Sequence, residues 1–132
     1  MTHLYKDDRA FGVTRIQLDE PDAVSAFKEG SLVRVRSISK GKGFQGVVKR
    51  HGFHGGPKTH GQKNRHRAPG SIGNTTPQRV IPGRHMAGRM GGEQVTIINM
   101  RLVRIEPETR VLCIHGAVPG NRGARVVVEQ NT

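Results

Sequence analysis

The chain has 132 residues, of which 33% are hydrophobic, and its 22 Lys and Arg against 10 Asp and Glu give a formal net charge of +12. That length suits one ordinary domain. No run approaches the ~18 apolar residues of a membrane span, and no apolar segment precedes Glu20, so we expect neither a membrane span nor a secretory signal. A lone cysteine, Cys113, excludes a disulfide framework and a cysteine-based zinc site, and the excess of cations points to a polyanionic partner, nucleic acid first.

Two elements are predicted before the most basic part of the chain. Residues 19–28 predict one helical turn that follows Pro21. Residues 31–36 alternate small or apolar residues with arginine, and two of the apolar residues are β-branched valines. A period of two on such residues predicts a strand.

The positive charge is concentrated in residues 30–92. This block carries thirteen Lys and Arg, five His and no Asp or Glu, whereas the flanking segments mix both signs. A solvated face normally mixes signs to limit self-repulsion, so the block needs an external source of negative charge. Residues 52–92 keep no helical or strand period and contain Gly or Pro every few positions, which is typical of a functional or disordered loop. A disordered basic tail is the alternative, but such tails lie at chain termini and patterned sequence flanks this block.

A glycine pattern near the start of the block resembles a dinucleotide-binding turn. Residues 41–46 match G-x-G-x-x-G. That site also needs a helix at the third glycine and an acidic residue about 20 positions later. Gly46 followed by Val47 and Val48 is a poor helix start, and the next acidic residue is Glu93. We therefore expect contacts from this turn to phosphates, and no dinucleotide site.

Five histidines lie in the same block at irregular spacings: His51, His54, His60, His66 and His85. A zinc site would need three or four convergent ligands with a supporting second shell, and no carboxylate is near these histidines. We expect no metal. Histidines in a basic loop more often stack on bases or donate to phosphates. Further on, Met86 and Met90 predict one short turn that packs its methionines on a β-barrel formed by the flanking strands.

Three apolar-rich runs that follow the block are predicted as strands: residues 95–105, 110–114 and 125–128. The first run places Ile98, Met100 and Leu102 on one face and ends before Pro107. A loop over residues 116–123, rich in Gly, Pro and Asn, separates the other two. Short strands with turn chemistry between them predict a small β-barrel or sandwich.

Catalysis has little support in the residue types. The acidic residue of a catalytic triad would have to come from the flanks, and the basic block lacks the two carboxylates of acid–base chemistry. Cys113 lies in an apolar strand and is expected to be buried and inert. We therefore expect no enzyme, no cofactor and no small-molecule substrate.

Several ordered segments resemble the bacterial large-subunit ribosomal protein L-three family. They are SKGKGFQG (39–46), KRHGF (49–53), HRAPGSIG (66–73), MAGRMG (86–91) and GAVPG (116–120). The resemblance runs from about residue 28 to residue 128. It covers most of the chain.

The resemblance implies a mainly β fold, a small translation-protein-type β-barrel with a long, irregular extension rich in Gly, Arg and Lys. Within a single domain (1–132), residues 1–38 would supply N-terminal barrel strands, residues 39–92 the extension and residues 93–132 C-terminal barrel strands. The extension of family members penetrates 23S ribosomal RNA (rRNA) towards the peptidyl transferase centre. Members bind RNA near its 3′ end early in subunit assembly and lie beside large-subunit proteins L-fourteen and L-nineteen.

Carried over by position, the resemblance and the charge assign rRNA contacts to an outgoing arm (residues 40–67) and a returning arm (residues 79–92). The fifteen contact residues are Lys40, Lys42, Lys49, Arg50, His51, Lys58, His60, Lys63, Arg65, His66, Arg67, Arg79, Arg84, His85 and Arg89. The uncharged tip between the arms comprises Ser71, Ile72, Gly73, Asn74, Thr75 and Thr76.

Two features depart from the family pattern. Members usually have a longer N-terminal half, so the resemblance implies an N-terminally shortened chain whose barrel is incomplete, a fragment or closed by another chain. Residues 11–16 match either an early strand or the strand just before the extension. Some members carry a modifiable glutamine at the tip, where this chain has Asn74, and that modification is not carried over.

The resemblance implies a non-catalytic constituent of the large ribosomal subunit, in the cytoplasm, that binds 23S rRNA and helps nucleate subunit assembly. Lys and Arg would supply phosphate contacts, while glycines let the backbone approach RNA closely. The alternative is an RNA-binding assembly factor or antitermination-like regulatory module that resembles the ribosomal protein. A phosphate-binding enzyme is a distant third.

Overall fold

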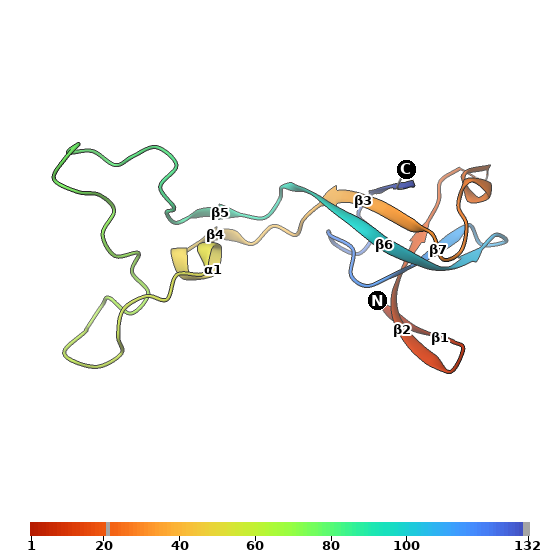
Figure 1. Ribbon diagram of the computed structural model, residues 1–132, viewed down its shortest axis with the longest axis horizontal. Helices are drawn as coiled ribbons and strands as arrows, with labels where there is room; N and C mark the ends of the chain where they lie inside the picture. The colour runs from red at the N-terminus through yellow and green to blue at the C-terminus, as the bar shows by residue number, and fades with distance from the viewer. Residues whose placement is uncertain (21, 131–132) are drawn as a thin grey trace. The chain divides into compact units, whose positions relative to one another are not determined.

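The computed structural model describes residues 1–20 and 22–130 of the chain (Figure 1). Two compact units are present. We call the first the sheet unit; it joins Met1–Lys40 to the described residues from Glu93 onward. We call the second the extension unit; it comprises Gly41–Gly92.

The sheet unit contains one six-stranded antiparallel sheet in the order β1-β2-β7-β6-β3-β8. Its strands are β1 (Thr2–Lys6), β2 (Arg9–Gln17), β3 (Leu32–Ile38), β6 (Gln94–Glu106), β7 (Val111–His115) and β8 (Val126–Gln130). The predicted mainly β class is therefore confirmed. A closed barrel needs pairing around the whole ring, but within residues 1–20 and 22–130 no pairing joins β1 to β8. Both strands are edges of an open sheet.

The predicted strands are all present. Residues 31–36, 95–105, 110–114 and 125–128 fall in or overlap β3, β6, β7 and β8. The helical turn predicted within residues 19–28 is a 3-10 helix, η1 (Asp22–Ala26); Pro21 lies outside the described residues. Residues 11–16 belong to β2, and since β3 directly precedes the extension unit, they form an earlier strand. The edge strand β1 was not predicted.

The core lies on both faces of the central strand β7, whose residues Val111, Leu112, Cys113 and Ile114 are all buried. Side chains alternate along a strand, so Leu112 and Ile114 pack into one cluster with residues of β3 and β6, while Val111 and Cys113 pack into another with Val13. Cys113 is buried as predicted, and its burial raises the pKa of the thiol. A buried thiol with a raised pKa is unreactive.

A bulge in β6 changes which side chains face the core. Opposite β3 the register shifts so that two β6 residues, Ile98 and Asn99, face one β3 residue, and Asn99 has a φ of 59°. An extra residue in one strand shifts the in–out alternation by one position. The prediction that Ile98 shares one face with Met100 and Leu102 is wrong: those two are buried, whereas Ile98 is 57% exposed and Ile97 packs against the core instead.

The extension unit is more regular near its two chain ends than the sequence predicted. Strands β4 (Gly43–Gln45) and β5 (Gly88–Met90) pair antiparallel, and helix α1 (Val47–His51) follows β4. In Figure 1 they lie where the two ends of a wide irregular loop meet. The turn predicted around Met86 and Met90 is wrong, because Met90 lies in β5.

Helix α1 also contradicts our expectation that Gly46-Val47-Val48 would not start a helix. Gly46 is an extended N-cap without a side-chain cap. Gly52 ends the helix in the left-handed conformation (φ 72°). Its N–H donates to the Val48 carbonyl (3.0 Å), and the Phe53 N–H donates to the Val47 carbonyl (3.5 Å). Glycine reaches that conformation without steric cost. Val47 packs inward and is the only buried residue among residues 41–92, all of which are described.

Candidate nucleic-acid interface

The two units differ sharply in charge. All ten Asp and Glu residues lie outside residues 41–92, whereas that segment holds ten Lys and Arg, so the extension unit carries +10 of the formal charge of +12. In the sheet unit, cations pair with carboxylates: Lys6–Glu29 (3.0 Å), Arg15–Glu106 (2.9 Å), Arg36–Glu129 (2.6 Å) and Arg34–Glu129 (3.8 Å). The extension unit has no carboxylate of its own to neutralise it. It is the candidate interface.

The predicted contact residues fall almost entirely within this unit. Lys40 ends the first segment of the sheet unit, and the other fourteen belong to the extension unit. Lys49, Arg50 and His51 lie on α1 and Arg89 lies on β5, while the rest follow irregular backbone. Twelve of the fifteen are exposed, and only Arg50, His51 and His66 are partly buried. Exposure makes phosphate contacts sterically feasible, but their role in RNA binding stays a prediction.

Two side chains of α1 contact the same backbone carbonyl oxygen of the returning arm. Arg50 Nη1 donates to the carbonyl of Met86 (2.8 Å), and His51 Nε2 lies 3.0 Å from the same oxygen. A carbonyl only accepts, so Nε2 of His51 carries the proton in this contact. A Cβ at Gly88 would lie 2.6 Å from Arg50 Nη1, so a side chain there would displace the Arg50 guanidinium from its present position. These contacts link the two arms of the extension unit.

Three rings meet beside that carbonyl, and we call His51, Phe53 and His85 the aromatic cluster. His51 and His85 stack face to face, with ring centroids 4.3 Å apart and planes 2° from parallel. Phe53 lies 6.0 Å from His51 and 6.4 Å from His85 in tilted arrangements. Sequence reasoning assigned both histidines to RNA one by one and missed Phe53. Nothing local links position 53 to position 85.

The distal part of the extension unit is held by a few backbone contacts. Gly56 N–H donates to the carbonyl of His66 (3.1 Å), which closes a loop that carries predicted contact residues. Gly55 has a φ of 77°, and a Cβ there would lie 2.0 Å from the same His66 oxygen. At the tip, Arg84 Nη2 donates to the Ser71 carbonyl (2.5 Å). Arg84 therefore has a structural contact in addition to its predicted role.

The tip itself is exposed to solvent and contains hydrogen bonds between its own residues. Ser71 Oγ donates to the carbonyl of Gly73 (2.8 Å), and Asn74 Oδ1 accepts from the Thr75 N–H (2.8 Å). The six tip residues are all exposed, including Ile72 at 43%. Small, uncharged side chains with local hydrogen bonds fit into a crowded space, but they cannot attract RNA over a long distance.

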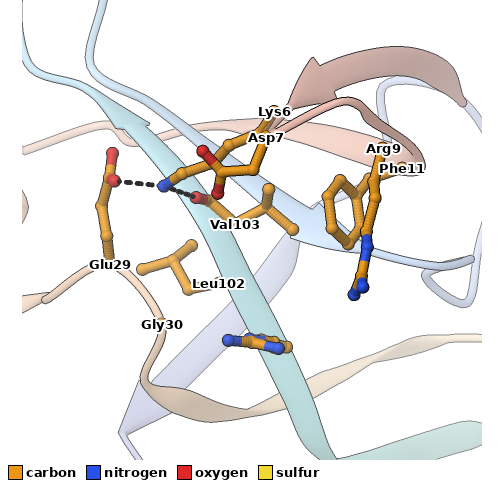
Figure 2. Close-up of a pocket in the computed structure, with 9 residues that line it drawn as sticks. Lys6, Asp7, Arg9, Phe11, Glu29, Gly30, Leu102 and Val103 are labelled. Atoms are coloured by element: carbon orange, nitrogen blue, oxygen red, sulfur yellow. Dashed lines mark hydrogen bonds and ion pairs between the residues drawn. The ribbon is translucent and has the colours of Figure 1, made fainter.

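A cavity of about 400 Å³ opens on the sheet unit, and none of the fifteen predicted contact residues is among its lining residues (Figure 2). Its lining includes the Lys6–Glu29 ion pair, and Lys6 Nζ also reaches the Val103 carbonyl (3.4 Å). Glu29 Oε1 accepts the Ile105 N–H (3.0 Å). That hydrogen bond and Lys6 together lower the pKa of Glu29. Glu29 thus ties the loop before β3 to β1 and β6.

Replacing Glu29 with Gln should lower stability at neutral pH and have little effect in acid. A carboxylate whose pKa is lowered by folding stabilises the native state above its unfolded pKa, and this contribution is lost as the pH falls through the folded pKa. Because the side chain is 43% exposed, we expect a loss of less than about 1 kcal/mol. Urea midpoints at neutral and acidic pH measure it, with Glu108→Gln as the control. An equal loss at both pH values would contradict the prediction.

Residues 1–20 and 22–130 contain no group of three or more His, Cys, Asp or Glu side chains arranged to hold a metal ion. Across the same residues, no helix has the length and apolar character to cross a membrane.

The sequence model of the ribosomal protein L3 family matches residues 10–112. This is the family that the sequence motifs resemble. The chain is 51% identical over 114 residues to large ribosomal subunit protein uL3 of Chlorobium limicola, covering 86% of this chain and 54% of that protein. It is 53% identical over 108 residues to uL3 of Herpetosiphon aurantiacus (81% and 51% covered) and 46% identical over 124 residues to uL3 of Geobacillus thermodenitrificans (94% and 58%). The chain spans about half the length of these relatives.

Proposed function

Because the chain belongs to the ribosomal protein L3 family, we propose that it is a non-catalytic structural component of the large ribosomal subunit that binds 23S rRNA through the extension unit. The relatives are named as proteins of that subunit. The location would be the cytoplasmic ribosome. Binding would help nucleate subunit assembly.

The observation that carries this proposal is the composition of the extension unit. Ten Lys and Arg occupy 52 residues without a carboxylate, and Val47 is the only buried residue there. Such a segment cannot offset its own repulsion or ordering entropy with a core. RNA phosphates supply the missing negative charge, and exposed guanidinium and ammonium groups bind them. The fifteen predicted contact residues are the groups that would do so.

The tip and the neighbours are finer parts of the same proposal. The uncharged tip, residues 71–76, would reach towards the peptidyl transferase centre, where small hydrogen-bonding side chains fit between RNA helices. The sheet unit would lie beside large-subunit proteins L-fourteen and L-nineteen. Support comes from the exposed tip and from family membership.

The second candidate is an assembly factor that shares the RNA-binding surface but leaves the finished particle. Co-sedimentation separates the two functions. A tagged copy of the full chain, expressed in a bacterial host, should remain on mature large subunits after a high-salt wash, at about one copy per subunit. Cryo-electron microscopy of those particles would locate the tip. Release by the wash, with association only to precursor particles, would favour the assembly factor.

A further inference from the structure

Among the groups that face RNA, the aromatic cluster of His51, Phe53 and His85 differs from the cations around it. Its rings come from both arms of the extension unit and assemble within one unit of the structure. Lys and Arg side chains bind phosphate without regard to the base attached to it. A planar ring offers a different contact, because every nucleobase has a flat face that stacks on it.

The three rings have different surroundings. His51 is partly buried, places one face on His85 and directs Nε2 to the Met86 carbonyl, so it is held on two sides. Phe53 is partly buried at an angle to both histidines. His85 is exposed. His51 covers one face of the His85 ring. The ring nitrogens of His85 have no hydrogen-bond partner among residues 1–20 and 22–130.

This arrangement also fixes the orientation of the exposed ring. The His85 ring lies parallel to the His51 ring, and His51 in turn contacts Phe53 and the Met86 carbonyl. A ring fixed before binding loses little conformational freedom when a base stacks on it. The Arg50 guanidinium donates to the carbonyl of Met86, the residue after His85, and so brings a positive charge to this part of the returning arm. A cationic side chain there favours a nucleotide phosphate.

We propose that the outer face of His85, supported by His51 and Phe53, is a stacking site for one unpaired RNA base. The inference rests on the proposed function and adds to it a contact with a nucleobase, which phosphate-binding side chains do not make. Imidazole is smaller than the rings of Tyr or Trp, so its contribution lies at the lower end of measured base–aromatic stacking. We expect about a five- to tenfold change in affinity.

The test compares two single-stranded probes with equal numbers of phosphates, an oligoriboadenylate and an abasic oligomer of the same length. The full chain at low salt should bind the oligoriboadenylate more tightly. His85→Ala should weaken that binding about five- to tenfold and leave the abasic oligomer unaffected. His85→Phe should restore the preference. His54→Ala is the matched control and should change neither affinity, because His54 is an exposed histidine of the same unit that stacks on no other ring among the described residues.

Each other outcome has a defined meaning. If His85→Ala weakens both probes equally, or weakens neither, the stacking site is wrong while RNA binding by the extension unit stands. If the unsubstituted chain binds neither probe nor ribosomal RNA at low salt, the proposed function fails, and the stacking site fails with it. An upfield shift of the His85 ring protons on adding the oligoriboadenylate would support stacking directly.

Discussion

The affinity of the chain for ribosomal RNA should fall by about three to five orders of magnitude when salt is raised from 50 to 200 mM. Each phosphate neutralised by Lys or Arg releases condensed counterions, and that release loses its entropic advantage as salt rises. The extension unit carries ten Lys and Arg and no carboxylate. With about six to ten phosphate contacts, the slope of log K against log salt should be of order −5 to −9.

Filter binding of a 23S rRNA fragment across a salt series measures this slope. Lys42→Ala/Lys49→Ala removes two exposed cations of the extension unit and should reduce the slope by about two. Arg15→Gln is the matched control, because Arg15 lies in the sheet unit and pairs with Glu106. It should leave the slope unchanged. A slope near zero for the unsubstituted chain would refute binding dominated by phosphates.

Leu112→Ala should destabilise the sheet unit by about 3–5 kcal/mol. Leu112 is fully buried on the central strand β7 and belongs to the cluster that joins β3, β6 and β7. Truncation to Ala removes buried apolar surface and leaves a cavity that the two neighbouring strands, fixed by their hydrogen bonds, cannot close. Urea unfolding followed by circular dichroism measures the loss, and a loss this large can leave a small unit unfolded at room temperature.

Ile98→Ala is the control that also tests the bulge in β6. The simple alternation of residues 95–105 places Ile98 inward, and that placement predicts a loss similar to that of Leu112→Ala. With Ile98 57% exposed, the loss should stay below about 1 kcal/mol. A large loss at position 98 would show that the strand alternates regularly and that Ile98 belongs to the core.

Much of the molecule was predictable from local patterns. The strands around residues 31–36, 95–105, 110–114 and 125–128 follow from apolar residues at a period of two, because that periodicity is a property of each segment alone. The burial of Cys113 follows in the same way. The separation of charge needs no structure at all, since the order of residues already places every carboxylate outside residues 41–92. These features determined the fold class and the candidate interface.

The predictions that were wrong, and the features that were not predicted, depend on contacts between segments distant in sequence. The exposure of Ile98 depends on how β6 pairs with β3. The sheet is open because, among the described residues, β1 pairs only with β2 and β8 pairs only with β3. The helix after Gly46 forms although its sequence disfavours a start, because Val47 packs inward and Gly52 ends it.

The aromatic cluster shows most clearly what only the tertiary structure decided. His51 and His85 are 34 positions apart, and the segment between them has no regular pattern. Their stacking follows from the β4–β5 pairing and from the Arg50 and His51 contacts to one carbonyl of the returning arm. The sequence by itself determined which residues carry charge and which segments extend. Contacts between residues distant in sequence decided which rings meet, because local periodicity carries no information about such contacts.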